Sequence, residues 1–171
     1  MLRPAAADVA SREDRESGSR ADDHRALRLW LRLLTCTYLI EGQVRSRLRE
    51  RFATTLPRFD LMSQLERHPE GLKMNELSRR MMVTGGNITG IVDPLVREGL
   101  VERQPDAADR RALRVRLTPA GARDFAEMAS AHEEWIVAML SGLSRREHTE
   151  LFRLLAKVKQ HALADLARGA T

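Results

Sequence analysis

The chain has 171 residues, of which 43% are hydrophobic and 31% are charged, and its formal net charge is +5. This length fits one compact domain, or a small domain with helical extensions, and the apolar fraction is enough for a core. The single cysteine, Cys36, excludes a disulfide framework within the chain, so we expect a reducing, cytoplasmic environment. No apolar run is long enough to cross a membrane, and the positive charge favours a polyanionic partner.

The first 23 residues are mostly Ala, Ser, Arg, Asp and Glu. Because few large apolar side chains occur there, burial would not offset the entropy lost on ordering, and we predict a disordered tail over residues 1–23. The segment also lacks the apolar stretch of a secretory signal.

A long helix is predicted from His24 to about Phe52, because apolar residues recur three and four positions apart. Its first half is apolar over a wide arc, which requires burial on more than one side. A partner subunit is the simplest cover for that arc. The apolar positions of this first half are Leu27, Leu29, Trp30, Leu31, Leu33, Leu34 and Tyr38.

Two short helices joined by a tight turn are predicted in the middle of the chain. Pro57 fits the first turn of the helix that precedes them, where a missing N–H is harmless. The two short helices cover residues 75–81 and 86–98, with the turn at 83–85. Gly99 then supplies a left-handed cap position. This arrangement is a helix-turn-helix.

A β-hairpin and two further helices complete the chain. Strands are predicted at residues 100–103 and 113–117, around a charged loop at 104–111. Thr118 followed by Pro119 is typical of a helix start, and residues 144–147 (SRRE) form a capping box for the last helix.

Together these elements predict a mainly α fold with a small β-hairpin wing. The winged helix-turn-helix lobe would span residues 57–117. The helices within 24–56 and 118–171 would form a dimerisation region, because their apolar faces are wider than one subunit can cover.

Five motifs in this chain resemble those of the MarR family of bacterial transcriptional regulators. The resemblance covers about residues 25–166. It implies a homodimer that binds double-stranded DNA on a pseudo-palindromic operator, usually as a repressor. It also implies release by a small aromatic acid that enters a pocket between the dimerisation helices and the DNA-binding lobe. The motifs are residues 56–62 (LPRFDLM), 74–80 (MNELSRR), 86–93 (GNITGIVD), 98–103 (EGLVER) and 109–121 (DRRALRVRLTPAG).

Within the second short helix, the apolar face should pack inward and leave the polar residues for DNA. Asn87 can pair with adenine, and Thr89 can contact a phosphate or a thymine methyl group; the alternative is that both side chains are local caps. Gly90 would let the backbone approach DNA closely. The complete DNA-binding prediction comprises Arg79, Arg80, Thr84, Gly86, Asn87, Thr89, Gly90, Asp93, Arg97, Arg103, Asp109, Arg110 and Arg111.

Two residues of this helix are unusual for a DNA-facing surface. Asp93 is acidic, and it could accept from a cytosine amino group or, as we favour, pair with Arg97 one turn further on. Pro94 removes the N–H that would bond to Gly90, at a cost of about 3 kcal/mol in a helix interior. We therefore predict a bend or a loosened turn over residues 90–94.

The family resemblance also assigns roles at the hairpin tip. Arg111 matches the minor-groove arginine of the family, and Asp109 matches the acid that braces it. Arg110 and Arg103 would add positive potential. The alternative is a solvated charged loop with no DNA contact.

Sensing residues are less evident. Cys36 lacks a second cysteine to pair with, and we predict a buried, inert thiol. The histidine spacings do not predict a metal site, and no cofactor is predicted. By the family picture, Tyr38, Phe59 and Met62 could line an effector pocket, with Arg45 meeting a carboxylate; the alternative is that the apolar residues are plain core.

Two other functional classes compete with DNA binding. A winged helix can instead serve as a protein-interaction module, such as an antirepressor that binds another regulator. An enzyme is not predicted, because the sequence has no nucleophile elbow, phosphate-binding loop, catalytic carboxylate pair or metal cluster.

Overall fold

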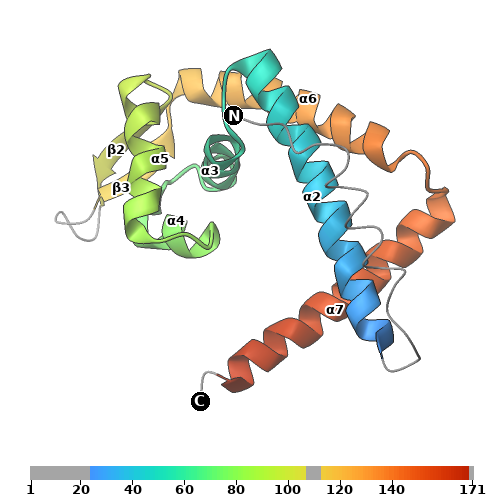
Figure 1. Ribbon diagram of the computed structural model, residues 1–171. Helices are drawn as coiled ribbons and strands as arrows, with labels where there is room; N and C mark the ends of the chain where they lie inside the picture. The colour runs from blue at the N-terminus through green and yellow to red at the C-terminus, as the bar shows by residue number, and fades with distance from the viewer. Residues whose placement is uncertain (1–23, 107–112, 170–171) are drawn as a thin grey trace. The chain divides into compact units, whose positions relative to one another are not determined.

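The computed structural model describes residues 24–106 and 113–169 and divides into two compact units, one ending at His132 and the other beginning at Glu133. The predicted mainly helical fold with a small β-wing is confirmed (Figure 1). The first unit contains the whole predicted winged lobe. The elements are α2 (Arg25–Phe52), α3 (Leu56–Glu66), β1 (Leu72–Lys73), α4 (Met74–Arg80), α5 (Gly85–Arg97), β2 (Val101–Pro105), β3 (Leu113–Leu117), α6 (Pro119–Leu140) and α7 (Arg145–Gly169).

The helix-turn-helix consists of α4 and α5, which are joined by a short turn at residues 81–84 (Figure 1). Thr84 has an extended backbone at the N-cap of α5, and its hydroxyl oxygen accepts a hydrogen bond from the Asn87 N–H. This cap satisfies one of the orphan donors of the first turn. At the other end, Gly99 has φ +72°, as the predicted left-handed cap requires.

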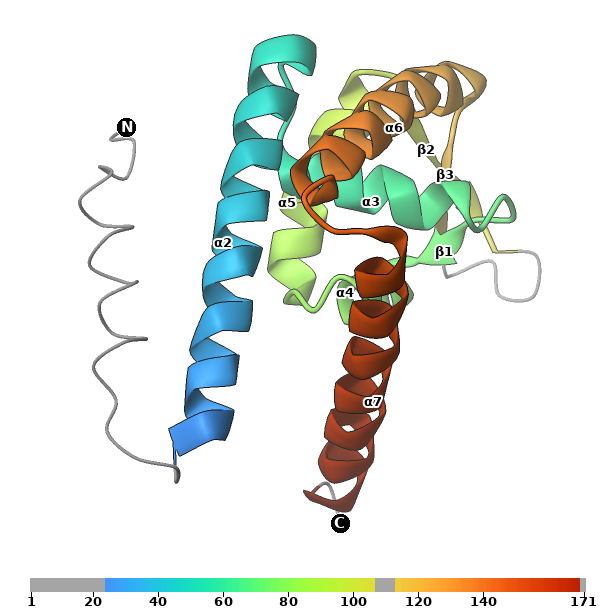
Figure 2. The ribbon, with the colours of Figure 1, turned by 90° about the vertical axis from the view of Figure 1, so that its right-hand side faces the viewer.

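The wing is a three-stranded antiparallel sheet in the order β1-β3-β2. The hairpin pairs Val101 with Leu117, and β1 adds to the other edge of β3 by pairing Leu72 with Val115 (Figure 2). Gly71 precedes β1 with φ +81°, and a Cβ there would lie 2.9 Å from the Val115 carbonyl oxygen. A glycine is therefore required where the chain enters the sheet.

The core of the first unit lies between α3, α5, the sheet and the first turns of α6. The predicted inward face of α5 is confirmed, because its three apolar residues are fully buried. Gly121 packs against the backbone at the start of β2, where a Cβ would meet the Leu100 oxygen at 1.9 Å. The buried apolar residues of this core are Leu48, Phe59, Leu61, Met62, Leu65, Leu72, Leu77, Ile88, Val92, Leu95, Val101, Val115, Phe125 and Met128.

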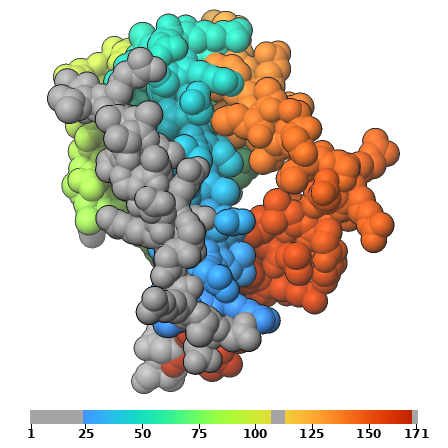
Figure 3. Space-filling view, turned by 45° about the vertical axis from the view of Figure 1, so that its right-hand side comes forward, coloured from blue at the N-terminus to red at the C-terminus, as the bar shows by residue number. Residues whose placement is uncertain are grey.

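The long first helix is unbroken through Gly42, and only Val44 and Leu48 on it are buried. Its first half carries the predicted apolar arc but leaves much of it open to solvent; α2 is the blue to cyan band in Figure 3. Cys36 is exposed, so the predicted buried thiol is wrong for the single chain. The reason is that no described segment of the first unit packs over the side of the helix that carries Cys36. Its exposed large apolar side chains are Leu27, Leu29, Trp30, Tyr38 and Leu39.

The second unit is dominated by α7, whose predicted capping box is confirmed. The Glu147 carboxylate accepts hydrogen bonds from the Ser144 N–H at 2.8 Å and from its hydroxyl at 2.6 Å. The helix is amphipathic, yet its apolar side is exposed along its length, and Phe152 is 79% exposed. The other exposed apolar residues of α7 are Leu151, Leu154, Leu155, Val158, Leu163 and Leu166.

Candidate nucleic-acid interface

The outward face of α5 is set by the three residues that the helix buries. Because successive residues turn by about 100°, the side opposite Ile88, Val92 and Leu95 carries Gly86, Gly90 and Arg97. These outward residues are all exposed. A Cβ added to Gly86 or to Gly90 would meet nothing within 4 Å, so packing inside the protein does not require glycine at either position. Because these two glycines have no side chain, another molecule can approach the backbone of α5 closely at both positions.

Some polar side chains at the start of α5 form local hydrogen bonds within the helix, and others are exposed. The hydroxyl of Thr84 caps the helix, and the hydroxyl of Thr89 donates to the Gly85 carbonyl at 3.2 Å. The alternative of a local role, left open for Asn87 and Thr89, therefore applies to the Thr89 hydroxyl group, and the Thr84 hydroxyl group has a local partner as well. Asn87 contributes its backbone N–H to the cap, while its side chain is exposed and has no hydrogen-bond partner among the described residues. Its carboxamide is thus free to read a base edge.

Asp93 pairs with Arg103 of β2, not with Arg97 as predicted. The chain turns back at Gly99, and β2 then runs beside α5, which brings a strand arginine to the helix carboxylate. The i,i+4 spacing within one helix cannot predict an ion pair with a residue that tertiary folding brings from another element. The pair ties α5 to the wing and partly neutralises Arg103. Arg97 is exposed and remains available for a phosphate.

Pro94 lies inside α5 without ending it, and the Glu98 N–H still bonds to the Pro94 carbonyl at 3.0 Å. Since proline has no N–H, the Gly90 carbonyl loses its usual i+4 donor. The absence of a side chain at Gly90 leaves open space around that turn. The bend that we predicted over residues 90–94 stays a prediction.

The predicted wing-tip residues Asp109, Arg110 and Arg111 lie outside the described residues. At the base of the wing the structure shows an ion-pair cluster that the sequence did not predict. Asp106 is 2% exposed; its carboxylate accepts from Arg114 Nε at 2.5 Å and lies 3.6 Å from Lys73 Nζ. No local pattern distinguishes this buried acid from the other charges of the loop.

Arg114 has a second bond, to the Gly71 carbonyl at 2.7 Å, so it joins β3 to the residue that precedes β1. The hydrogen bond to Asp106 raises the pKa of Arg114 further above its ordinary value. Arg116 pairs with Glu102 across the hairpin at 2.6 Å. These two strand arginines therefore have partners within the sheet. Their contribution to a DNA-facing potential is reduced accordingly.

Arg79 and Arg80 occupy the last turn of α4, and both are exposed. Basic side chains at a helix C-terminus interact favourably with the helix dipole. This local role and a phosphate contact are compatible, because a guanidinium group on an exposed turn can serve both.

Neither of two cavities lined by described residues contains all of the predicted effector residues. Met62 lines a cavity of about 520 Å³, whereas Phe59 lines another of about 310 Å³, where its ring lies 4.8 Å from that of His132. Burial lowers the pKa of His132. Tyr38 and Arg45 line neither of these two cavities, and Arg45 is paired with Glu41 at 2.8 Å.

Among the described residues, no three histidine, cysteine or acidic side chains are grouped as metal ligands would be. None of the helices in this part of the chain has the length and apolarity to span a membrane.

Comparisons with known proteins agree with this architecture. A sequence model of the MarR family matches residues 54–112. The HTH-type transcriptional regulator YkoM of Bacillus subtilis is 31% identical over 90 residues, which are 53% of this chain and 58% of YkoM. The HTH-type transcriptional regulator PecS of Dickeya dadantii is 29% identical over 105 residues, 60% of this chain and 63% of PecS. The matched parts are thus less than two thirds of either curated relative.

A solved structure extends the likeness beyond the winged lobe. The MarR family transcriptional regulator from Silicibacter pomeroyi has 30% sequence identity and a TM-score of 0.70, with 84% of this chain and 99% of that chain covered. These relatives are regulators rather than enzymes. The motifs, the winged helix-turn-helix and these matches agree, and the chain belongs to the MarR family of transcriptional regulators.

Proposed function

We propose that this chain is a sequence-specific, double-stranded DNA-binding repressor that acts as a homodimer on a pseudo-palindromic operator. The observation that carries the proposal is the outward face of α5. That face begins at a capped helix N-terminus and continues over two exposed glycines beside an exposed asparagine. A helix with small residues on its outer face can enter a major groove closely.

The wing complements this helix as a second contact. The hairpin β2-β3 is joined to α5 by the Asp93–Arg103 ion pair, which holds the strand next to the helix. The family's groove-reading arginine matches Arg111, next to Asp109 and Arg110. Arg110 and Arg111, with Arg79, Arg80 and Arg97, would supply the positive charge that phosphate binding needs.

Dimerisation is supported by apolar surface that each unit leaves uncovered. The first half of α2 and the length of α7 expose rows of large apolar side chains. Monomeric proteins rarely expose contiguous apolar patches of this kind. Two copies related by a two-fold axis would present their α5 helices about 34–36 Å apart, one turn of DNA.

Regulation by a small effector is the remaining part of the proposal. The aromatic acid implied by the family resemblance would need Tyr38, Phe59, Met62 and Arg45 in one pocket, and the two cavities divide or omit them.

Selection of bound sequences from random DNA tests the proposal, followed by fluorescence titration of the selected site at several salt concentrations. We expect a palindromic consensus and an affinity that falls linearly with salt on logarithmic axes. Asn87→Ala should lose about 1–3 kcal/mol of binding and relax the preference at one base pair. Gln160→Ala on α7 is the matched control and should bind like the parent.

Arg111→Ala tests the wing. The expected result is weaker binding to all sequences, with the salt slope reduced by about 1. If the parent protein ignored duplex DNA at low ionic strength, the DNA-binding proposal would be wrong. The protein-interaction alternative would then be favoured.

A further inference from the structure

One backbone carbonyl in the middle of α5 lacks its regular hydrogen-bond donor. In an α-helix each carbonyl accepts from the N–H four residues further on, so the carbonyls inside a helix are normally occupied. Residue 94 is a proline and has no N–H, yet α5 continues without a break from Gly85 to Arg97. The carbonyl left without its i+4 donor is that of Gly90.

This carbonyl belongs to the side of the helix that faces away from the core. Gly90 is exposed, and at about 100° per residue it lies roughly 200° around the helix from the buried Ile88. Glycine has no side chain to shield the oxygen, and the space where its Cβ would be is open. A proline ring also crowds the carbonyl four residues before it, and carbonyls on the solvent side of a helix tilt outward. A donor from outside the protein can therefore reach the Gly90 oxygen.

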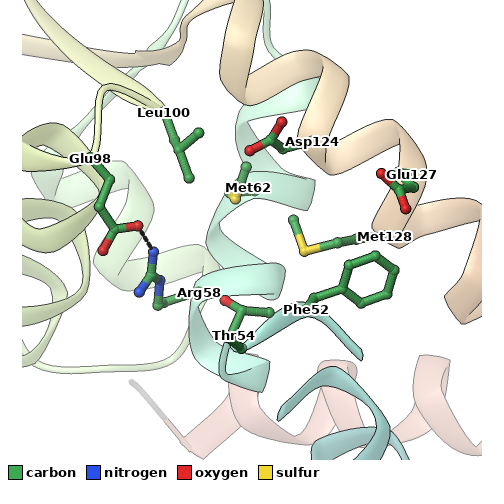
Figure 4. A pocket seen from close by; sticks show the side chains of 10 residues that line it. Phe52, Thr54, Arg58, Met62, Glu98, Leu100, Asp124, Glu127 and Met128 are labelled. Carbon is green, nitrogen blue, oxygen red and sulfur yellow. Dashed lines mark hydrogen bonds and ion pairs between the residues drawn. The ribbon is translucent and has the colours of Figure 1, made fainter. Parts of the chain in front are cut away.

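Contacts at both ends of α5 hold the helix together despite the missing bond. At the N-terminus, the Thr84 side chain caps the first turn. At the C-terminus, the Glu98 N–H donates to the Pro94 carbonyl at 3.0 Å, and the Glu98 carboxylate pairs with Arg58 of α3, as the dashed line in Figure 4 shows. Because these contacts lie on either side of Gly90, its carbonyl keeps a helical position and does not need the turn to unwind.

The side chains around this carbonyl divide into occupied and available groups. Asp93, the acidic acceptor of the same helix, is occupied by Arg103 of β2. Asn87 lies three residues before Gly90, at a neighbouring position on the helix surface, and its exposed carboxamide can donate and accept. Arg97 is exposed and offers only donors. A backbone acceptor thus lies between a group that can read a base and a group that can hold a phosphate.

We propose that the Gly90 carbonyl, left without a donor by Pro94, accepts a hydrogen bond from a base amino group in the major groove. Cytosine N4 and adenine N6 are the donors that base edges present there, so this contact selects cytosine or adenine at one position of each half-site. Pro94 is then a specificity-determining residue that acts through the backbone of Gly90. This inference rests on the proposed function and deepens it, because it names a chemical group that the helix reads.

Pro94→Ala tests the inference, because it returns an N–H to residue 94 that can occupy the Gly90 carbonyl. The operator selected from random DNA is synthesised with one amino group removed at a time, purine replacing adenine and pyrimidin-2-one replacing cytosine. Loss of the amino group that is read should weaken binding of the parent about three- to tenfold, as expected for one hydrogen bond. Pro94→Ala should bind the intact operator and that modified operator equally. Measuring both proteins on both DNAs cancels the effect of the modification on the duplex itself.

Val96→Ala is the matched control in the same helix; it keeps Pro94 and should discriminate like the parent. Thermal unfolding should show a higher midpoint for Pro94→Ala than for the parent, because the restored N–H completes the helix. A midpoint that does not rise, or a parent that binds the operator but tolerates removal of every amino group, overturns the inference. So does a Pro94→Ala variant that weakens binding to all of these DNAs by the same factor, since a bend alone would do that. Failure to select any operator would instead contradict the proposed function, and this inference with it.

Discussion

The winged lobe buries its apolar side chains, whereas the last helix exposes those on its apolar face. Within the lobe, helices α3, α4 and α5 bury theirs against one another and against the sheet, so that Leu61, Leu77 and Leu95 have no exposed surface. From Arg145 to Arg168, α7 buries no residue, although its apolar side is just as regular. Regular spacing therefore establishes that a helix has an apolar face, but the covering surface has to come from elsewhere.

Charged residues differ between the two regions in the same way. Asp106 in the lobe is almost fully buried and holds Arg114 and Lys73 together. Asp165 on α7 pairs with Arg168 at 3.3 Å, but it is 76% exposed. Buried and exposed ion pairs differ greatly in what their loss costs. We therefore expect the largest change in the free energy of unfolding from a substitution at the buried ion pair.

Asp106→Ala should lower the free energy of unfolding by about 1.5–3 kcal/mol, because it removes the carboxylate that accepts from Arg114 and lies beside Lys73 at the base of the wing. Urea denaturation followed by circular dichroism measures the change. Asp165→Ala is the matched control on α7 and should change stability by less than about 0.5 kcal/mol. Equal effects of the two substitutions would contradict the contrast between the regions.

Phe152→Ser should weaken self-association more than tenfold, since burying a phenylalanine side chain contributes about 1.5–3 kcal/mol. Analytical ultracentrifugation over a range of concentrations measures the equilibrium. Met82→Ser removes an apolar side chain of the lobe that is even more exposed than Phe152, and the dimer should persist. Loss of the dimer in both variants, or in neither, would show that α7 is not its interface.

Thr84→Ala should destabilise the lobe by about 1 kcal/mol, because the substitution removes the side-chain cap of α5. Thr84→Ser keeps the hydroxyl and should restore most of the loss. Urea midpoints of the three proteins give the comparison. A stability of the alanine variant equal to that of the parent would mean that the 3.4 Å bond contributes nothing.

The smallest expected effects concern the two capping carboxylates, one in each region. The Lys73 N–H lowers the pKa of Glu76, and the Ser144 hydroxyl and N–H lower the pKa of Glu147, from an ordinary value of 4.5. A depressed carboxyl pKa contributes stability above pH 4.5 that is lost as the pH falls through the folded-state value.

Glu76→Gln and Glu147→Gln should therefore be less stable than the parent at pH 7, and the difference should be smaller at pH 3. Thermal unfolding at the two pH values provides the measurement, with Glu134→Gln as an uncapped control. A stability difference that persisted unchanged at pH 3 would exclude the carboxylate charge as its cause.

Much of the candidate site could be predicted from sequence, because its signals are local. The apolar spacing of α5 fixed its inward residues and hence its outward face, and Gly99 marked its end. The partner of Asp93 could not be predicted in this way, because Arg103 reaches it only after the chain reverses. Asp106 and the division of the effector residues between two cavities were missed for the same reason.

The sequence by itself determined the elements, their caps and the family, since these depend on residues a few positions apart. Spacing, turn glycines and capping side chains act within one or two helical turns. Only the tertiary structure decided which charges are neutralised, which glycines are needed for close packing, and that Cys36 and the face of α7 are exposed. Those outcomes depend on where distant segments meet, and the contacts that decide them are non-local.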